Sequence, residues 1–324
     1  MIMIVAIAIA AGCASALMFA SMISGALVSL LLIYFAPLPL MVAALGWGPL
    51  ASTIGGIMAA VGIGAVFGLP LCIAFAIMMG LPAWWLGHLA LLGRPVANAP
   101  SGNGAAPVAP AIEWYPIGRV LLWIAGFAVL ITAATLLTFG SDAATIHATL
   151  RAALLQILGP RVTASGEDIR QQIDALIAIA PAACANSIMA MLTLNLWLAA
   201  RITTTSGRLH RPWPVLKSTE LPPMTLAALS AAIAFCFTGG LLAILAQAIT
   251  AALLMTYALI GLAVLHTLTL GLKSRALWLS CTYAILVLSG GWLLITMVIL
   301  GLADAIFGFR RRYLQGRPPP LPVS

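Results

Sequence analysis

The sequence predicts an all-α fold, a polytopic membrane helical bundle of about eight transmembrane helices, with roughly seven to nine as the range. The first observation is composition: 63% of the 324 residues are hydrophobic and 7% are charged, whereas a soluble domain carries about 25% charge. The second is length, because several apolar runs reach the roughly 20 residues that one span needs. The third is that these runs are unbroken and do not alternate with a period of two, which favours helices over a β-barrel.

The N-terminal membrane bundle is predicted to cover residues 1–93, which contain no Asp, Glu, Lys or Arg. This length accommodates about four spans. Glycine and proline are the only residues here that typically interrupt a helix, so they mark the predicted ends of the spans. We expect helices over residues 3–21, 23–45, 50–67 and 70–92.

The stretch "YFAPLPLMVAALGWGP" (Tyr34–Pro49) interrupts the second span. Pro37 and Pro39 each remove a backbone donor, which leaves helix carbonyls without partners. In a membrane those carbonyls need protein, water or ligand as a partner. The sequence therefore predicts a kink or short break inside the span, with Gly46–Pro49 as the turn out of it. A packed kink and a break that holds a small molecule are both compatible with the sequence.

Small residues recur every four positions in two of the predicted spans. Small side chains allow helix backbones to approach closely, where lipid supplies no hydrophobic drive. They predict either helix packing within the subunit or a docking face for a partner membrane protein. The residues are Ser52, Gly56, Ala60, Gly64 and Gly68 in the third span, and Ala6, Ala10 and Ala14 in the first.

Residues 94–119 are rich in Pro, Ala, Gly and Asn, and we expect a flexible cytoplasmic linker. The end of this linker, Glu113–Pro116, has the aromatic character of an interface anchor. A C-terminal membrane bundle is predicted over residues 120–303, beginning with a span near 120–140.

Residues 141–177 are predicted to form an external amphipathic helical segment. One helix would begin at Ser141 and Asp142, and a second at the capping-box pair Ser165 and Asp168. The two helices would either lie at the membrane surface or cap the bundle. Acidic and basic residues nearly balance here, which suits the outer side of the membrane.

Basic residues predict which loops are cytoplasmic. After a span near 179–200, the loop from Arg201 to Lys217 is basic, and so is the tail 304–324. Both are therefore placed in the cytoplasm of a bacterium, with the chain in the inner membrane. The overall net charge of +8 is explained by these topology determinants, so we expect no nucleic-acid partner.

The number of spans in the C-terminal part is less well defined by the sequence. Length favours three spans, near 224–243, 246–271 and 277–301, which would place the basic tail outside. We give the arginines more weight and predict eight spans in total. One more crossing, or a re-entrant segment at Gly239–Gly240 or Gly290–Gly291, would supply the even number.

The sequence offers little for chemistry. It contains no HExxH, GxSxG or P-loop pattern and no paired carboxylates within a span, so we do not expect an enzyme. The five cysteines are dispersed, and we expect no metal site and no cofactor. Charged residues are scarce within the spans, which disfavours an ion-coupled transporter with its own energy source. Asp304 is interpreted as a helix-end carboxylate that is either paired with a base or solvated.

A few uncharged residues are candidates for ligand binding. Asn186 and Asn195 are nine positions apart on one predicted helix and so face opposite sides. Each would either bond to a neighbouring helix or line a pocket for a small neutral or amphipathic molecule. The full set of candidates is Tyr34, Pro37, Pro39, Trp47, Asn186, Asn195 and Trp197.

Several strings in one order resemble the alphaproteobacterial branch of a bacterial membrane family, the domain of unknown function 2232 family. They are "YFAPLPL…LGWG" (Tyr34–Gly48), "LPAWWLG" (Leu81–Gly87), "EWYPIGR" (Glu113–Arg119), "NLWLAARI" (Asn195–Ile202), "GLAVLH" (Gly261–His266) and "GLADAIFGFRRR" (Gly301–Arg312). That family is similar, at superfamily level, to the substrate-binding subunits of energy-coupling-factor vitamin transporters. The resemblance implies capture of a small molecule with energy borrowed from a partner module.

In those vitamin transporters the partner docks on small residues of the first helix, a part that Ala6, Ala10 and Ala14 would play here. The chain has more spans than the usual six and no recognisable vitamin site, so no binding residue is carried over.

Two functions follow as hypotheses. The first is a substrate-binding or permease-like subunit for a small neutral or amphipathic molecule, without its own energy source. The alternative is a structural or assembly partner in the inner membrane with no small-molecule ligand. The expected partners are the lipid bilayer and another membrane subunit. An enclosed cavity of roughly 300 Å³ or more with convergent polar groups would favour the first hypothesis. A solid bundle with an exposed groove of small residues would favour the alternative.

Overall fold

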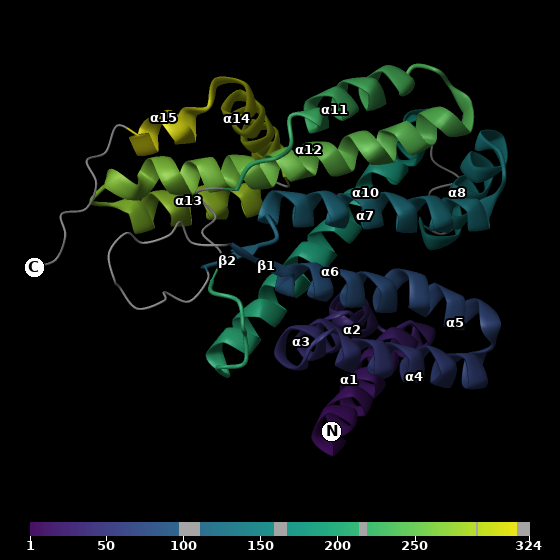
Figure 1. The fold of residues 1–324 in the computed structure, drawn as a ribbon. Helices are drawn as coiled ribbons and strands as arrows, with labels where there is room; N and C mark the ends of the chain where they lie inside the picture. The colour runs from purple at the N-terminus through teal and green to yellow at the C-terminus, as the bar shows by residue number, and fades with distance from the viewer. Residues whose placement is uncertain (97–110, 159–166, 214–218, 290, 316–324) are drawn as a thin grey trace, which may run out of the picture. The chain divides into compact units, whose positions relative to one another are not determined.

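A computed structural model describes residues 1–324 except 97–110, 159–166, 214–218, 290 and 316–324. Throughout the described residues the fold is all-α apart from one short hairpin (Figure 1). Within these described residues, seven helices are long and apolar enough to cross a membrane, and a bent pair counted as one span would make the number eight. This confirms the predicted polytopic helical membrane protein.

The first four candidate spans agree with the predicted spans to within a few residues. Gly48 and Gly68, with φ of 94° and 90°, separate the second, third and fourth spans. Each is followed by a helix that carries proline in its first turn. The helices are α1 (Ile2–Ala20) with η1 (Ser21–Ser24), α2 (Leu27–Phe35), α3 (Leu38–Trp47), α4 (Pro49–Phe67), α5 (Leu69–Phe75), a π-helical turn η2 (Ala76–Gly80) and α6 (Leu81–Leu91).

The predicted break in the second span is confirmed. Helix α2 ends at Phe35, and α3 begins at Leu38 after the turn at Ala36 and Pro37. Because Pro37 has no N–H, the helical hydrogen-bond ladder is interrupted at this point. The two helices together still make one candidate span, Leu27–Trp47.

Helices α1 and α4 approach at backbone distance. A Cβ atom on Gly12 would overlap the Gly55 carbonyl, and a Cβ on Gly55 would overlap the Ala8 carbonyl. The α4 positions buried at this crossing are Ala51, Gly55 and Ala59. The close contact therefore uses a row of small residues one position away from the row that the sequence analysis selected.

The small residues that the sequence pointed to are, on the whole, more exposed than Ala51, Gly55 and Ala59. In α4, Ser52 is buried, and Gly56, Ala60, Gly64 and Gly68 are partly exposed. In α1, Ala6 and Ala10 are exposed and Ala14 is partly exposed. The alternatives of internal packing and partner docking stay open for this row.

The two ends of the predicted linker 94–119 pair as a hairpin. Strands β1 (Gly93–Val96) and β2 (Ala111–Trp114) are antiparallel, with Gly93 opposite Trp114. Arg94 Nη2 and Glu113 Oε2 form an ion pair of 2.6 Å across the strands. The centre of the linker lies outside the described residues.

Three helices follow: α7 (Ile117–Phe139), α8 (Ala143–Leu158) and α10 (Glu167–Thr205). Asp142 caps α8, since its Oδ1 accepts the Thr145 N–H at 2.9 Å and its Oδ2 accepts the Thr145 hydroxyl at 2.7 Å. These hydrogen bonds from Thr145 hold the pKa of Asp142 below its usual value. Ile146 of α8 is fully buried against α7 and α12, so α8 packs on the bundle.

The second predicted amphipathic helix is not a separate element. Helix α10 runs for 39 residues and continues through Pro181 into the predicted span near 179–200. Arg151 of α8 forms an ion pair with Asp174 of α10. The predicted capping residue Ser165 lies outside the described residues.

Two of the predicted C-terminal spans, 224–243 and 277–301, are not continuous helices, and each is interrupted at one of the glycine pairs that the sequence offered as a re-entrant point. The first ends early, because Gly239 and Gly240 adopt φ of 81° and 63°, and the second is divided at Gly291, with φ of 96°. The elements are α11 (Met224–Phe235), α12 (Gly240–Leu268), η4 (Thr269–Gly271), α13 (Arg275–Leu288), α14 (Trp292–Phe307) and α15 (Phe309–Gln315). Helix α11 is about 18 Å long at 1.5 Å per residue, shorter than the hydrocarbon core.

The contacts group the chain into two compact units, which differ from the predicted bundles 1–93 and 120–303. Unit 1 comprises residues 1–127 and 190–214, and unit 2 comprises 128–189 and 215–324. Helices α7 and α10 each contribute one part to each unit.

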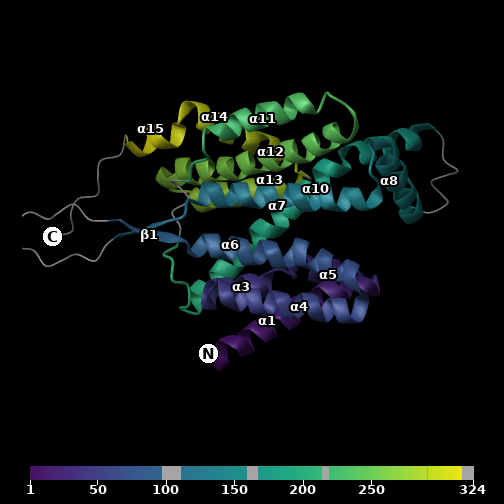
Figure 2. The ribbon, with the colours of Figure 1, turned by 45° about the vertical axis from the view of Figure 1, so that its right-hand side comes forward.

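In unit 2, α12 lies alongside α11 and α14 (Figure 2). A Cβ on Gly261 of α12 would overlap the Met297 carbonyl, and a Cβ on Gly301 of α14 would overlap the Tyr257 carbonyl. Each unit therefore has one helix crossing in which glycines bring two backbones into contact.

Candidate binding site

Two carbonyls at the Pro37 break have side-chain partners. The Ser15 hydroxyl donates to the Ala36 carbonyl at 2.6 Å, and the Asn195 side-chain amide donates to the Tyr34 carbonyl at 2.8 Å. The donors come from α1 and α10, so two other helices satisfy the interrupted backbone. This arrangement corresponds to a packed kink, the first of the two alternatives that the sequence left open.

The structure brings two of the predicted ligand-binding residues into contact and places others apart from them. Tyr34 and Asn195, 161 positions apart, share the hydrogen bond described above. Asn195 is fully buried, and its Oδ1 has no hydrogen-bond partner in the described part of the chain. Asn186 and Trp197 are exposed positions of α10.

The remaining candidates lie along α3. Pro37 is buried, and Pro39 is partly buried in the first turn. The guanidinium carbon of Arg208 lies 4.9 Å from the centre of the Trp47 ring. A cation on one face of an indole is stabilising, and it covers that face against a ligand.

A pocket of about 550 Å³ lies in unit 2, where α14 ends and α15 begins. Its walls come from the segment before α11, from α11 and α12, and from α14 and α15. The lining residues are Glu220, Leu221, Pro222, Pro223, Thr225, Leu226, Tyr257, Ile260, Asp304, Ala305, Ile306, Phe307, Gly308, Arg310, Arg311, Arg312, Leu314 and Gln315.

A glycine makes the bend beside this pocket. The axes of α14 and α15 differ in direction by 64°. Gly308 adopts a left-handed conformation, with φ of 64°, and its N–H donates to the Asp304 carbonyl at 2.7 Å. A side chain in that conformation would cost about 1–2 kcal/mol, so glycine suits this position. The bend returns the chain to the Asp304 carboxylate.

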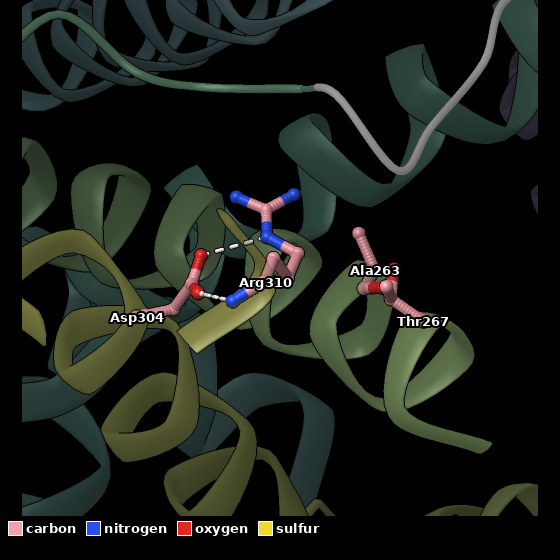
Figure 3. A network of polar contacts seen from close by, with 4 residues as sticks. All are labelled: Ala263, Thr267, Asp304 and Arg310. Atoms are coloured by element: carbon pink, nitrogen blue, oxygen red, sulfur yellow. Dashed lines mark hydrogen bonds and ion pairs between the residues drawn. The ribbon is translucent and has the colours of Figure 1, made fainter. Parts of the chain in front are cut away.

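Asp304 and Arg310 form a buried ion pair (Figure 3). Asp304 Oδ1 accepts the backbone N–H of Arg310 at 2.8 Å, and Oδ2 accepts the Nε–H at 2.7 Å. Each residue is 6% exposed. Burying two charges is costly unless the pair is well hydrogen-bonded, and here both carboxylate oxygens have a donor.

The Arg310 guanidinium is only partly satisfied by this pair. Its two terminal nitrogens extend away from Asp304 (Figure 3), and Nη1 is buried without a partner among the described residues. Thr267 on the neighbouring α12 donates its hydroxyl to its own helix, at the Ala263 carbonyl, at a distance of 2.8 Å. The guanidinium therefore has donor capacity left for an acceptor.

The other walls of the pocket combine polar and apolar groups. The Tyr257 hydroxyl donates to Thr225 Oγ1 at 3.1 Å, which links α12 to α11. Leu226, Ile260 and Phe307 line the same cavity. An amphipathic molecule can thus find hydrogen-bonding groups and apolar surface within one site.

Sequence reasoning did not identify this site. The arginines of the tail were interpreted as topology determinants, and Asp304 as a helix-end carboxylate either paired with a base or solvated. The ion pair with Arg310 agrees with the first of these alternatives for Asp304. The usable signal was the spacing in "DAIFGFR" (Asp304–Arg310), where a glycine between an acid and a base allows the chain to bend back.

The fold and the pocket define an integral multi-pass membrane protein with a partly polar cavity. Comparisons with protein-family models, with curated proteins and with solved structures find no match to this chain. The resemblance to the domain of unknown function 2232 family is therefore without support from a family match and stays a prediction.

Proposed function

We propose that the chain is a membrane-embedded binding subunit for a small amphipathic molecule, with no catalytic activity and no energy source of its own. The observation that carries this proposal is the pocket beside Asp304 and Arg310. Its volume of about 550 Å³ exceeds the roughly 300 Å³ expected of a small-molecule site. Polar and apolar groups converge on it.

The proposed site lies in unit 2 and not at the Pro37 break. At the break, the Tyr34 and Ala36 carbonyls have side-chain donors, and Asn195 Oδ1 is without a partner in the described structure. In the pocket, a buried guanidinium nitrogen has no acceptor in the described structure. Each place therefore holds a buried polar atom without a partner, and the pocket of about 550 Å³ is the observation that favours unit 2.

The family resemblance and the distribution of basic residues support the cellular setting of this proposal. The chain resides in the bacterial inner membrane with its basic tail in the cytoplasm. A partner module supplies the energy and docks on α1, where Ala6 and Ala10 are exposed.

The test is to identify molecules that the purified protein retains, and to fill the pocket. Ala305 is an exposed residue of the pocket wall. We expect that Ala305→Trp removes a small molecule that mass spectrometry detects in the wild-type protein. Ala276→Trp, at an exposed position of α13, is the matched control and should retain the molecule.

The alternative function, a structural or assembly partner, rests on the close glycine crossings in both units. It would be favoured if the wild-type protein and both tryptophan variants retained nothing, and if another membrane protein were purified with all three. That result would contradict the binding proposal.

A further inference from the structure

We propose that the pocket binds a phosphate-headed amphiphile, with the phosphate on Arg310 and the chain against the apolar wall. This inference rests on the proposed function and names the class of its ligand. It follows from the orientation of Arg310, from the charge of the pocket, and from the pocket's size and place in the chain.

Asp304 orients Arg310 for an anion. The carboxylate accepts the backbone N–H and the Nε–H of Arg310, so the terminal nitrogens are directed away from it (Figure 3). Nη1 is buried and lacks an acceptor within the described residues. A buried donor without an acceptor is destabilising, and an oxygen of a ligand would satisfy it. Because the fork is already held in place, little side-chain freedom is lost on binding.

The charge of the pocket favours an anion. Among the described residues that line it are three arginines, Arg310, Arg311 and Arg312, and two carboxylates, Asp304 and Glu220. No ion pair of Arg311 or Arg312 is found in the described parts of the chain. A planar guanidinium binds phosphate through two parallel hydrogen bonds. A phosphate has more oxygens than a carboxylate, so it can contact a second arginine while it is bound to the first.

The size of the pocket requires more than a headgroup. A bare phosphate would leave most of about 550 Å³ unfilled. Leu226, Ile260 and Phe307 provide an apolar wall, and burying a hydrocarbon chain there is favourable by about 0.8 kcal/mol per CH₂. The ligand is therefore an amphiphile, and its chain contributes to affinity.

The place of the pocket in the chain agrees with this ligand. Its walls include α15 and the segment that follows the basic loop from Arg201 to Lys217. Basic loops and tails lie on the cytoplasmic side, where the leaflet is rich in anionic lipid phosphates. A phospholipid of the bilayer and a free phosphorylated amphiphile share this chemistry.

Native mass spectrometry of the full chain in detergent tests the proposal. The delipidated protein is incubated separately with dioleoyl phosphatidic acid, dodecyl phosphate, oleate and dioleoylglycerol. We expect phosphatidic acid to be retained at least tenfold more than dioleoylglycerol, which lacks the phosphate. Stronger retention of phosphatidic acid than of dodecyl phosphate supports a bilayer phospholipid, and the reverse supports a free phosphorylated amphiphile.

Three variants locate the headgroup. Arg310→Lys keeps a positive charge beside Asp304 but lacks the fork, and it should lower retention at least tenfold. The double variant Asp304→Asn/Arg310→Gln removes both charges without leaving one buried alone, and it should lose retention while keeping its thermal unfolding midpoint within a few degrees. Arg151→Gln lies outside the pocket and should retain phosphatidic acid as the wild type does.

Different results would overturn different steps. Equal retention of oleate and phosphatidic acid, or retention that is independent of Arg310, would overturn the phosphate assignment and leave the binding function standing. Displacement of phosphatidic acid by millimolar inorganic phosphate would overturn the role of the chain. If the wild type retained no amphiphile and Ala305→Trp changed nothing, the proposed function itself would fail.

Discussion

At the scale of single residues, side chains from distant helices satisfy the backbone where prolines interrupt it. The Asn195 amide reaches the Tyr34 carbonyl across 161 positions, and Ser15 reaches Ala36. Polar side chains in a membrane bundle are costly unless they are paired. Hydrogen bonds from Asn195 and Ser15 therefore lower the free-energy cost of interrupting the helix at Pro37.

Asn195→Ala should destabilise the protein by about 1–2 kcal/mol, because it removes an interhelical hydrogen bond at a buried site. Asn186→Ala on the same helix should change stability by less than about 0.5 kcal/mol, since Asn186 is exposed. The measurement is the unfolding midpoint of the purified variants in one detergent. Equal midpoints for the two variants would contradict this role of Asn195.

Arginines of the 201–211 segment contact three tryptophans, which sequence reasoning did not foresee. Arg201 lies over Trp213, Arg208 over Trp47, and Arg211 over Trp114, at 5.1, 4.9 and 5.9 Å from the ring centres. Arg211 also donates to the Tyr115 carbonyl at 3.1 Å, and burial lowers its pKa. Arg201 lies in the last turns of α10, and Arg208 and Arg211 lie in the loop that follows. The positive-inside rule explains a basic loop, but the contacts with the tryptophans depend on the folded backbone.

At the scale of helices, the sequence predicted the N-terminal spans well because proline and glycine mark their ends. The break at Ala36 and Pro37 and the turn at Gly48 were both expected from local chemistry. The row of small residues at the α1–α4 crossing was missed by one position, because α4 offers small residues on neighbouring faces. Which face meets α1 is decided by the partner helix, and a single-helix pattern does not contain that information.

Gly55 and Gly56 of α4 provide a matched pair. Gly55→Ala places a methyl group on the Ala8 carbonyl and should cost about 1–3 kcal/mol by overpacking. Gly56→Ala meets nothing within 4 Å, so it should be neutral or stabilising by up to about 1 kcal/mol, the difference in helix propensity. The thermal unfolding midpoints of the two variants test this difference. The opposite order would show that the row of Gly56 is the packing face.

The C-terminal helices could not be predicted from hydrophobicity alone. Apolar composition is continuous through Gly239–Gly240 and Gly291, but the positive φ of these glycines ends the helices there. A window of mean hydropathy measures composition and not backbone conformation. The pocket also depends on a glycine with positive φ, because Gly308 bends the chain back to Asp304. Counting apolar spans therefore could not predict the pocket.

At the scale of the whole molecule, the bent pair α14–α15 is compatible with the even number of spans that we predict. The described residues contain seven candidate spans, and the bent pair, counted as one span, would bring the number to eight. Eight crossings place the basic loop after α10 and the basic tail on one side, as their arginines require.

Cysteine labelling in a background without native cysteines checks this topology. We expect Ser206→Cys in the basic loop and Gln315→Cys before the tail to react only from the cytoplasmic side. Gln156→Cys in α8 should react from outside. All three positions are exposed. A Gln315→Cys variant that reacts from outside would exclude eight crossings and support seven or nine.

The sharing of α7 and α10 between the two compact units has a consequence for biosynthesis. Residues 190–214 of unit 1 are made after residues 128–189 of unit 2. The Tyr34 carbonyl is translated early, yet its partner Asn195 leaves the ribosome 161 residues later. The Ala36 carbonyl can pair with Ser15 as soon as the first two spans are made, whereas the Tyr34 carbonyl lacks its Asn195 donor until α10 has been synthesised.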